Sequence, residues 1–165
     1  MHTQHDTTER DYILSVYTQN NSGVLLRVAG LFSRRGYNIQ SIMAAQTKDE
    51  AHSQILIVVR GDDSIVRQVD KQLSKLEEVE HVSVLNDNEA VVREHLLMKI
   101  ARIESNSEQL IAIASVFHAN ILNVTTDNII LELTGTPKTL DSFAECYSPY
   151  QIIKILRTGT MAMEL

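Results

Sequence analysis

Hydrophobic and polar positions follow strand and helix periods in turn along this chain, and the same order of periods occurs twice. In the first copy, Leu25, Val28, Leu31 and Phe32 recur at helical spacing, and Gly36 suits the end of that helix. Short β-branched and aromatic runs on either side are typical of strands. The predicted elements of this copy are a strand at 12–17, a helix at 24–35, strands at 37–45 and 54–60, a helix at 65–76 and a strand at 81–85.

The second copy repeats this order of elements. Ser105 and Glu108 have the spacing of a capping box before its first helix, and Thr136 with Pro137 suits the start of its second helix. Its predicted elements are a strand at 95–103, a helix at 110–117, a hairpin of strands at 120–125 and 129–134, a helix at 140–147 and a strand at 152–156.

Two copies of the order β-α-β-β-α-β predict the α+β fold class, with two helices on one face of an antiparallel sheet in each copy. Domains of this size are near the lower limit for a self-sufficient core, so we expect a sheet edge or helix face to pair between halves or between chains. The expected parts are a disordered tail at 1–10, a first domain at 11–86, a linker at 87–92 and a second domain at 93–165.

Charge and composition narrow the classes of function. The 15 Lys and Arg against 21 Asp and Glu give a formal net charge of −6, which argues against a nucleic-acid partner. The apolar run 55–59 is far too short to span a membrane, and the first residues lack a secretion signal. Cys146 is the single cysteine, so an intrachain disulfide is excluded. We therefore expect a cytoplasmic protein without a membrane partner.

Catalytic chemistry has little support in the sequence. Cys146 falls on the last predicted helix, where we expect a half-buried packing role, and neither a GxGxxG nor a P-loop pattern occurs. The histidines have no metal-ligand spacing, so we expect neither a catalytic residue nor a metal. They are His2, His5, His52, His81, His95 and His118.

One loop has the character of a binding site. A helix start carries unpaired N–H groups and a partial positive charge, and Gly23 would let a ligand approach the amides of Val24 and Leu25. The Asn20 and Asn38 side chains can each donate to a carboxylate or accept from an ammonium group. This combination suits an amino-acid zwitterion.

The neighbours of this loop refine the expectation and leave an alternative open. Leu25 and Ile39 would suit an aliphatic ligand side chain. The alternative is that Ser22 or Asn21 only caps the helix. In the second copy the equivalent loop, 103–108, lacks glycine and holds two glutamates, so we expect a ligand in the first copy alone.

The run NNSGVLLRVAGLFSRRGYNIQSI at 20–42 strongly resembles the ACT domain of the small regulatory subunits of acetolactate synthase. Similar segments follow at 72–76, 93–100 and 157–159. The resemblance covers about 11–160 and is tighter in the first half. One departure is the turn at 49–54, which lacks the usual proline and has glutamine where arginine is common.

The resemblance implies a fold and a role. The family combines an N-terminal ACT domain with a ferredoxin-like C-terminal domain, and it forms a homodimer through its ACT domains. Such a subunit has no catalytic activity. It binds and activates the catalytic large subunit and confers feedback inhibition by valine in branched-chain amino acid biosynthesis. No cofactor belongs to this chain; thiamine diphosphate, Mg and FAD are expected in the catalytic partner.

Effector-site residues carry over by motif position. One chain would supply the residues at the helix start, which are Asn20, Gly23, Val24 and Leu25. Its partner chain would supply Asn38, Ile39 and Ala45.

Two alternatives and one ambiguity remain open. A tandem ACT sensor could regulate transcription through a protein partner. A small hydrolase of the acylphosphatase kind would need a loop arginine, which 20–23 does not contain. Leucine or isoleucine would fit the same apolar pocket as valine.

Overall fold

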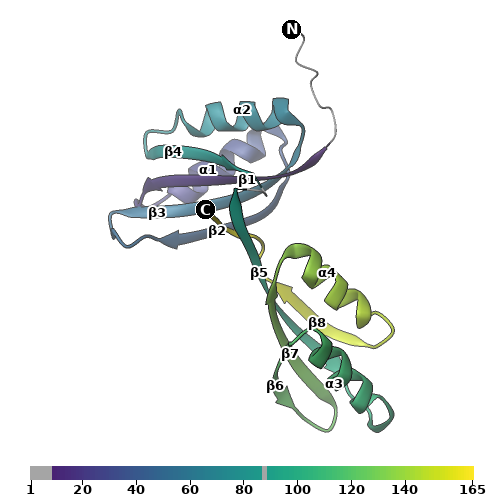
Figure 1. Cartoon of the computed structure of the whole chain (residues 1–165). Coiled ribbons are helices and arrows are strands. Elements are labelled where there is room, and N and C mark those ends of the chain that lie inside the picture. Colours follow the sequence, from purple (N-terminus) through teal and green to yellow (C-terminus); the bar gives the residue numbers. More distant parts are fainter. Residues whose placement is uncertain (1–8, 87–88) are drawn as a thin grey trace. The chain divides into compact units, whose positions relative to one another are not determined.

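The computed structural model describes residues 9–86 and 89–165, which form two compact units (Figure 1). The first unit extends to Val91 and also includes Thr160–Leu165; the second is Val92–Gly159. The expected tail lies outside the described residues up to position 8, and Arg10, which we had placed in it, begins the first strand. Strand β5 starts at Ala90, inside the expected linker.

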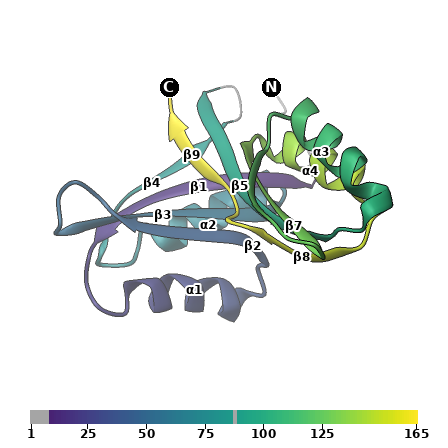
Figure 2. The ribbon, with the colours of Figure 1, turned by 90° about the horizontal axis from the view of Figure 1, so that it is seen from below.

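In the first unit, two helices cover one face of a four-stranded antiparallel sheet with strand order β2-β3-β1-β4 (Figures 1 and 2). This is the predicted order of elements. The elements are β1 (Arg10–Gln19), α1 (Val24–Arg35), β2 (Ile39–Gln46), β3 (His52–Gly61), α2 (Asp63–Leu73) and β4 (Val79–Leu85).

The core of this unit follows from strand alternation. Leu14 and Val16 on β1 face the helices with Ile57 on β3, and all three are fully buried. The predicted bounds of α1 are confirmed, but its buried stripe begins one residue early: Val24 is 5% exposed, whereas Leu25 is 46% exposed. The side chains of α1 that face the sheet are therefore those of Val24, Val28 and Leu31, and Leu25 lies beside this row.

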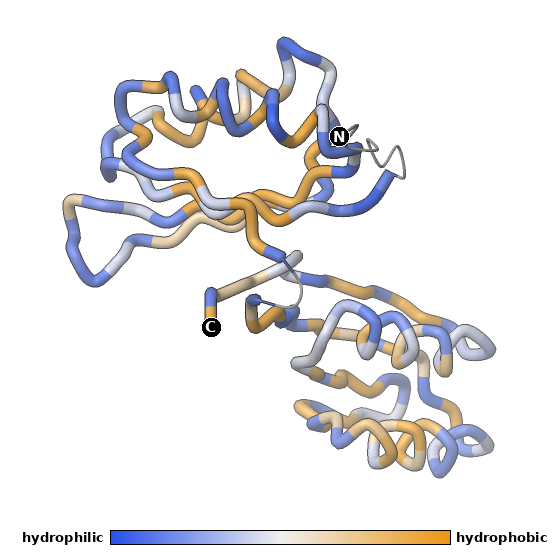
Figure 3. Tube along the Cα trace, turned by 45° about the horizontal axis from the view of Figure 1, so that its top comes forward, coloured by the Kyte–Doolittle hydropathy of each residue, from blue (hydrophilic) through white to orange (hydrophobic). Residues whose placement is uncertain are grey.

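The second unit repeats the arrangement with strand order β6-β7-β5-β8, so the predicted fold class is confirmed. Figure 3 shows apolar positions recurring along its helices and strands. Its elements are β5 (Ala90–Ala101), the 3-10 turn η1 (Glu104–Asn106), α3 (Ser107–Val116), β6 (Asn120–Val124), β7 (Asn128–Gly135), α4 (Pro137–Cys146) and β8 (Ile152–Arg157).

The capping residues predicted for the helices of this unit are confirmed only in part. The Thr136 hydroxyl accepts from the amide of Thr139 at 3.2 Å, as predicted. The predicted capping box of Ser105 and Glu108 is wrong. Asn106 Oδ1 instead accepts a hydrogen bond from the Ile103 amide at 2.9 Å, and the chain forms the 3-10 turn η1 there. Cys146 is exposed rather than half-buried.

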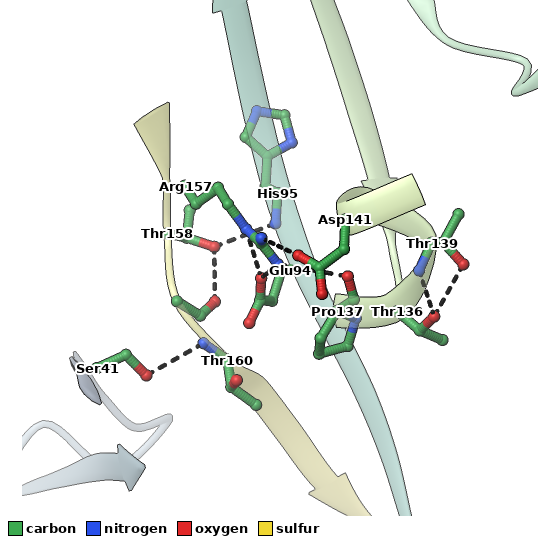
Figure 4. Close-up of polar contacts among 11 residues, drawn as sticks. Ser41, Glu94, His95, Thr136, Pro137, Thr139, Asp141, Arg157, Thr158 and Thr160 are labelled. Atoms are coloured by element: carbon green, nitrogen blue, oxygen red, sulfur yellow. Dashed lines mark hydrogen bonds and ion pairs between the residues drawn. The ribbon is translucent and has the colours of Figure 1, made fainter. Parts of the chain in front are cut away.

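A last strand, β9 (Met161–Glu164), was not predicted and pairs with β5. The Thr160 amide donates to Ser41 Oγ at 3.4 Å (Figure 4), and the Leu165 amide donates to the Glu89 carbonyl at 3.0 Å. The C-terminal six residues thus belong to the first unit, although we had assigned them to the second domain.

Candidate functional site

The start of α1 is open. Gly23 adopts a left-handed φ of 85°, and no side chain of the described residues caps the helix. The Val24 amide donates to the Asn21 carbonyl at 3.3 Å, while the Asn21 side chain donates to Gln19 Oε1 at 3.0 Å. The alternative that Ser22 or Asn21 caps this helix is therefore wrong, and the next amides of the first turn have no capping side chain.

The electrostatics of this helix start favour an anion. Its first turn carries no acidic residue, so the positive end of the helix dipole is not neutralised locally. Arg27 lies in the same turn and forms an ion pair with Glu78 at 2.5 Å, with Glu78 only 18% exposed. A Cβ at position 23 would lie 3.5 Å from Arg27 Nη1, and the left-handed φ would strain any residue with a side chain there. These features suit a small carboxylate.

Asn20 holds this loop in place. Its side-chain nitrogen donates to the Glu50 carbonyl at 3.0 Å, and its side-chain oxygen accepts from Ser53 Oγ at 3.0 Å. Its backbone amide donates to the Ala51 carbonyl at 2.7 Å. The Gly23 loop is thereby tied to the turn between β2 and β3, and both ends of the Asn20 amide are engaged. Direct contact of Asn20 with a ligand stays a prediction.

Strand β3 begins with a histidine that the sequence analysis did not single out. His52 Nδ1 lies 2.7 Å from Asp49 Oδ2, and Nε2 lies 3.1 Å from Glu80 Oε1 on β4. Its ring stacks on Tyr17 at 4.9 Å. The hydrogen bond to Asp49 raises the pKa of His52, and Glu80 adds to this. The pKa of Asp49 is lowered, first by the Ala51 amide and then by His52.

The glutamine that departs from the family pattern also has a structural role. Gln54 Nε2 donates to Ser15 Oγ at 2.8 Å, which joins β3 to β1 on the face away from the helices. Gln54 thus links two strands of the sheet at the position where arginine is common in the family.

The structure brings some of the candidate residues together and separates others. Ala45 pairs with Gln54 near the end of β2, on the same side of the unit as Asn20. Asn38 precedes Ile39, which pairs with Val59 at the opposite end of β2. The two ends of this strand are about 20 Å apart at the usual rise of a strand. Within one chain, Asn38 and Ile39 therefore lie far from Gly23.

Apolar side chains are exposed on α1 and on the edge strand beside it. Leu26 is 77% exposed, Leu25 is 46% exposed and Ile42 on β2 is 37% exposed. Strand β2 ends the sheet on this side. An exposed edge with apolar neighbours is typical of a surface that pairs with another strand.

The equivalent loop of the second unit is different. Glu104 lies in the first turn of η1 and Glu108 in the first turn of α3, so a ligand carboxylate would meet like charge there. In the described part of the chain, no three His, Cys, Asp or Glu side chains cluster as metal ligands. None of the described helices is long and apolar enough to cross a membrane.

These features define a class: a tandem α+β protein whose first unit has the fold and the open helix start of an ACT domain. Residues 14–81 match the model of the ACT domain of AHAS small subunit-like proteins, and residues 93–165 match the model of the small subunit of acetolactate synthase.

Known proteins are similar in sequence to this chain over nearly its whole length. An acetolactate synthase small subunit of Buchnera aphidicola is 40% identical over 152 residues, which is 92% of this chain and 96% of that protein. The acetolactate synthase isozyme 3 small subunit of Escherichia coli is 38% identical, covering 92% and 93%. The crystal structure of the Thermotoga maritima small subunit matches with a TM-score of 0.87 and 32% identity, covering 94% and 98%. The chain belongs to the family of acetolactate synthase small subunits.

Proposed function

We propose that this chain binds the catalytic large subunit of acetolactate synthase, activates it, and makes it sensitive to inhibition by valine. Family membership supports a regulatory-subunit role. The observation that carries the effector part is the uncapped start of α1 behind the left-handed Gly23. Thiamine diphosphate, Mg and FAD are assigned to the catalytic partner, and this chain acts without catalysis of its own.

The effector site forms between two chains. If two copies pair antiparallel along β2 about a twofold axis, the start of one β2 faces the end of the other. Asn38 and Ile39 of the partner would then approach Gly23 of this chain. Ala45 lies at the Gly23 end of its own chain, so here it joins the helix-start group rather than the partner's group. The exposed Ile42 near the middle of β2 would lie close to the axis.

Valine is bound by complementary charge and shape. Its carboxylate meets the uncapped amides that follow Val24 in the first turn of α1, and its ammonium group meets asparagine side-chain or backbone oxygens. Leu25 and Ile39 contact its isopropyl group. A ligand this small gains at most about 1.5 kcal/mol per non-hydrogen atom, which fits micromolar to millimolar affinity. Leucine and isoleucine are the competing effectors.

Regulation follows from the shared site. A ligand held by two chains favours one arrangement of the dimer over others, and the catalytic subunit responds to that arrangement. A coupling of about 1–3 kcal/mol would change activity by about 5–150-fold.

Reconstitution tests this function. The chain is added to the catalytic large subunit of the same organism, and acetolactate formation is measured with and without valine, leucine and isoleucine. We expect activity to rise on addition of the chain and to fall with valine. Unchanged activity on addition of a folded chain would exclude the proposed role.

A further inference from the structure

His52, at the start of β3, lies between two carboxylates of the first unit. Its Nδ1 is 2.7 Å from Asp49 Oδ2 in the turn between β2 and β3, and its Nε2 is 3.1 Å from Glu80 Oε1 on β4. A neutral imidazole carries a proton on one nitrogen, so it donates to one carboxylate and turns a lone pair to the other. Only the protonated ring satisfies both contacts. The geometry by itself therefore favours a charged histidine.

The other titratable groups near this ring come from the turn, from β1 and from β4. Tyr17 on β1 stacks on the ring, and His81 on β4 pairs with Tyr17. Glu78, just before β4, forms an ion pair with an arginine of α1. Within the described ranges, the side chains of Lys48 and Glu50 in the turn form neither an ion pair nor a hydrogen bond with the imidazole. The charge of the ring is thus governed by its two carboxylate partners.

The turn that the imidazole holds also supports the loop that opens α1. The Asn20 amide donates to the Ala51 carbonyl at 2.7 Å, and the Asn20 side chain donates to the Glu50 carbonyl at 3.0 Å. Asp49 Oδ1 accepts from the Ala51 amide at 3.1 Å, so the carboxylate that faces the ring also fixes the residue to which Asn20 bonds. Gly23 follows Asn20 by three positions. A continuous series of hydrogen bonds and peptide units thus connects the ring with the helix start.

We propose that His52 is a positioning residue of the effector site and that its protonation sets the affinity for valine. The protonated ring holds the turn to β4, and through Asn20 it holds the Gly23 loop in the conformation that receives the effector. Loss of the proton leaves a lone pair against a carboxylate, which loosens the turn and the loop with it. This inference rests on the proposed function, since it names a regulation of the same site.

The direction of the coupling follows from the two charge states of the ring. The hydrogen bond with Asp49 is the main cause that raises the pKa of His52 above its ordinary value of about 6.5, so the charged form persists above that pH. Valine binds more tightly to this form, and its affinity falls as pH rises through the folded pKa. Because coupling between two sites is reciprocal, bound valine raises the pKa of His52 further.

Two substitutions at these contacts have opposite expected effects at high pH. In Glu80→Gln the new amide can donate to the lone pair on Nε2, so a neutral ring is held on both sides and valine binding should stay tight as pH rises. In His52→Gln no ring contacts both carboxylates, so binding should be weak throughout. His81→Gln is the matched control, because His81 faces the hydroxyl of Ser83, which donates or accepts equally well.

Titration calorimetry on the full chain measures the valine dissociation constant between about pH 5.5 and about pH 8.5. We expect it to rise about fivefold or more with pH for the unmodified chain and for His81→Gln, and to stay constant for the other two variants. A pH-independent affinity of the unmodified chain, or an undiminished pH dependence in His52→Gln, would overturn the inference and leave the proposed function intact. Absence of valine binding at every pH would contradict the proposed function.

A measurement without effector keeps these two failures apart. Nuclear magnetic resonance follows the ring protons of His52 and the amides of Val24 and Leu25 in the free chain over the same pH range. We expect the amide signals to shift with the midpoint of His52, to lose this shift in His52→Gln and to keep it in His81→Gln. Circular dichroism checks that each variant is folded. Amide signals of the unmodified chain that do not follow His52 would overturn the proposal, whether or not valine binds.

Discussion

The Ser53 hydroxyl donates to the side-chain oxygen of Asn20 at 3.0 Å, and so a residue of β3 fixes the loop that opens α1. The other end of the same side chain holds the Glu50 carbonyl. Asn20 thus supports the loop that precedes α1, and the geometry of the helix start depends on the β2–β3 turn.

We expect Asn20→Ala to lower the free energy of unfolding by about 1 kcal/mol and to weaken valine binding, because two hydrogen bonds that fix the loop are lost. Urea unfolding and titration calorimetry measure the two effects. Asn21→Ala is the matched control, since that side chain bonds only to its neighbour Gln19 among the described residues. Equal losses in the two variants would remove the special role of Asn20.

Gly23→Asp should abolish inhibition by valine and leave activation of the large subunit in place. The new carboxylate would occupy the position of the ligand carboxylate at the positive end of α1. Gly23→Asn controls for backbone strain, because asparagine has the same shape and tolerates the left-handed conformation better than most residues. We expect Gly23→Asn to keep measurable inhibition at raised valine concentrations, whereas Gly23→Asp shows none. Full valine sensitivity of Gly23→Asp would show that the effector site is elsewhere.

Arg157 should contribute strongly to the stability of the second unit. Its Nε donates to Glu94 Oε2 at 2.9 Å, where the Glu94 side chain is 9% exposed, and its Nη1 lies 2.5 Å from Asp141 (Figure 4). Arg157→Gln leaves a nearly buried carboxylate without its arginine, so we expect a loss of about 3 kcal/mol in urea unfolding. Asp141→Asn, at a 67% exposed position, should cost about 0.5 kcal/mol. A small effect of Arg157→Gln would mean that water or another group compensates Glu94.

Stability should fall with rising pH through the titration of His52. Its pKa is raised, chiefly by the hydrogen bond with Asp49, so the folded state binds its proton more tightly than the unfolded state. The resulting stabilisation is complete below the unfolded pKa of about 6.5 and is lost as pH rises through the higher folded value. His52→Gln should remove this part of the pH dependence. Parallel unfolding profiles for both proteins between about pH 6 and about pH 8 would contradict the assignment.

The sequence predicted the order of elements because local signals agree with the fold. The apolar stripe of α1, its arginines at the last turn and Gly36 after it gave the correct helix ends. The sequence analysis placed Leu25 rather than Val24 in the buried stripe, because periodicity alone does not show how the helix is rotated on the sheet. The left-handed turn at Gly23 sets that rotation.

Other features could not be predicted because their partners are distant in the chain. The site of His52 depends on Glu80, which comes from a different strand. Strand β9 is a four-residue segment with two exposed methionines, and only its pairing partner makes it a strand. The separation of Asn38 from Gly23 follows from the register of β2 on β3, and a local stretch of sequence does not determine that register.

The return of Thr160–Leu165 to the first unit has a consequence for biosynthesis. A ribosome releases the earliest part of a chain first, yet this unit still lacks its closing segment when the rest of it has left the exit tunnel. Its final packing must wait until residues 160–165 have left the exit tunnel, after the whole second unit has been made. A bulky insertion within 160–165 would therefore burden the first unit, which holds the Gly23 loop, although these residues follow the second unit in the sequence.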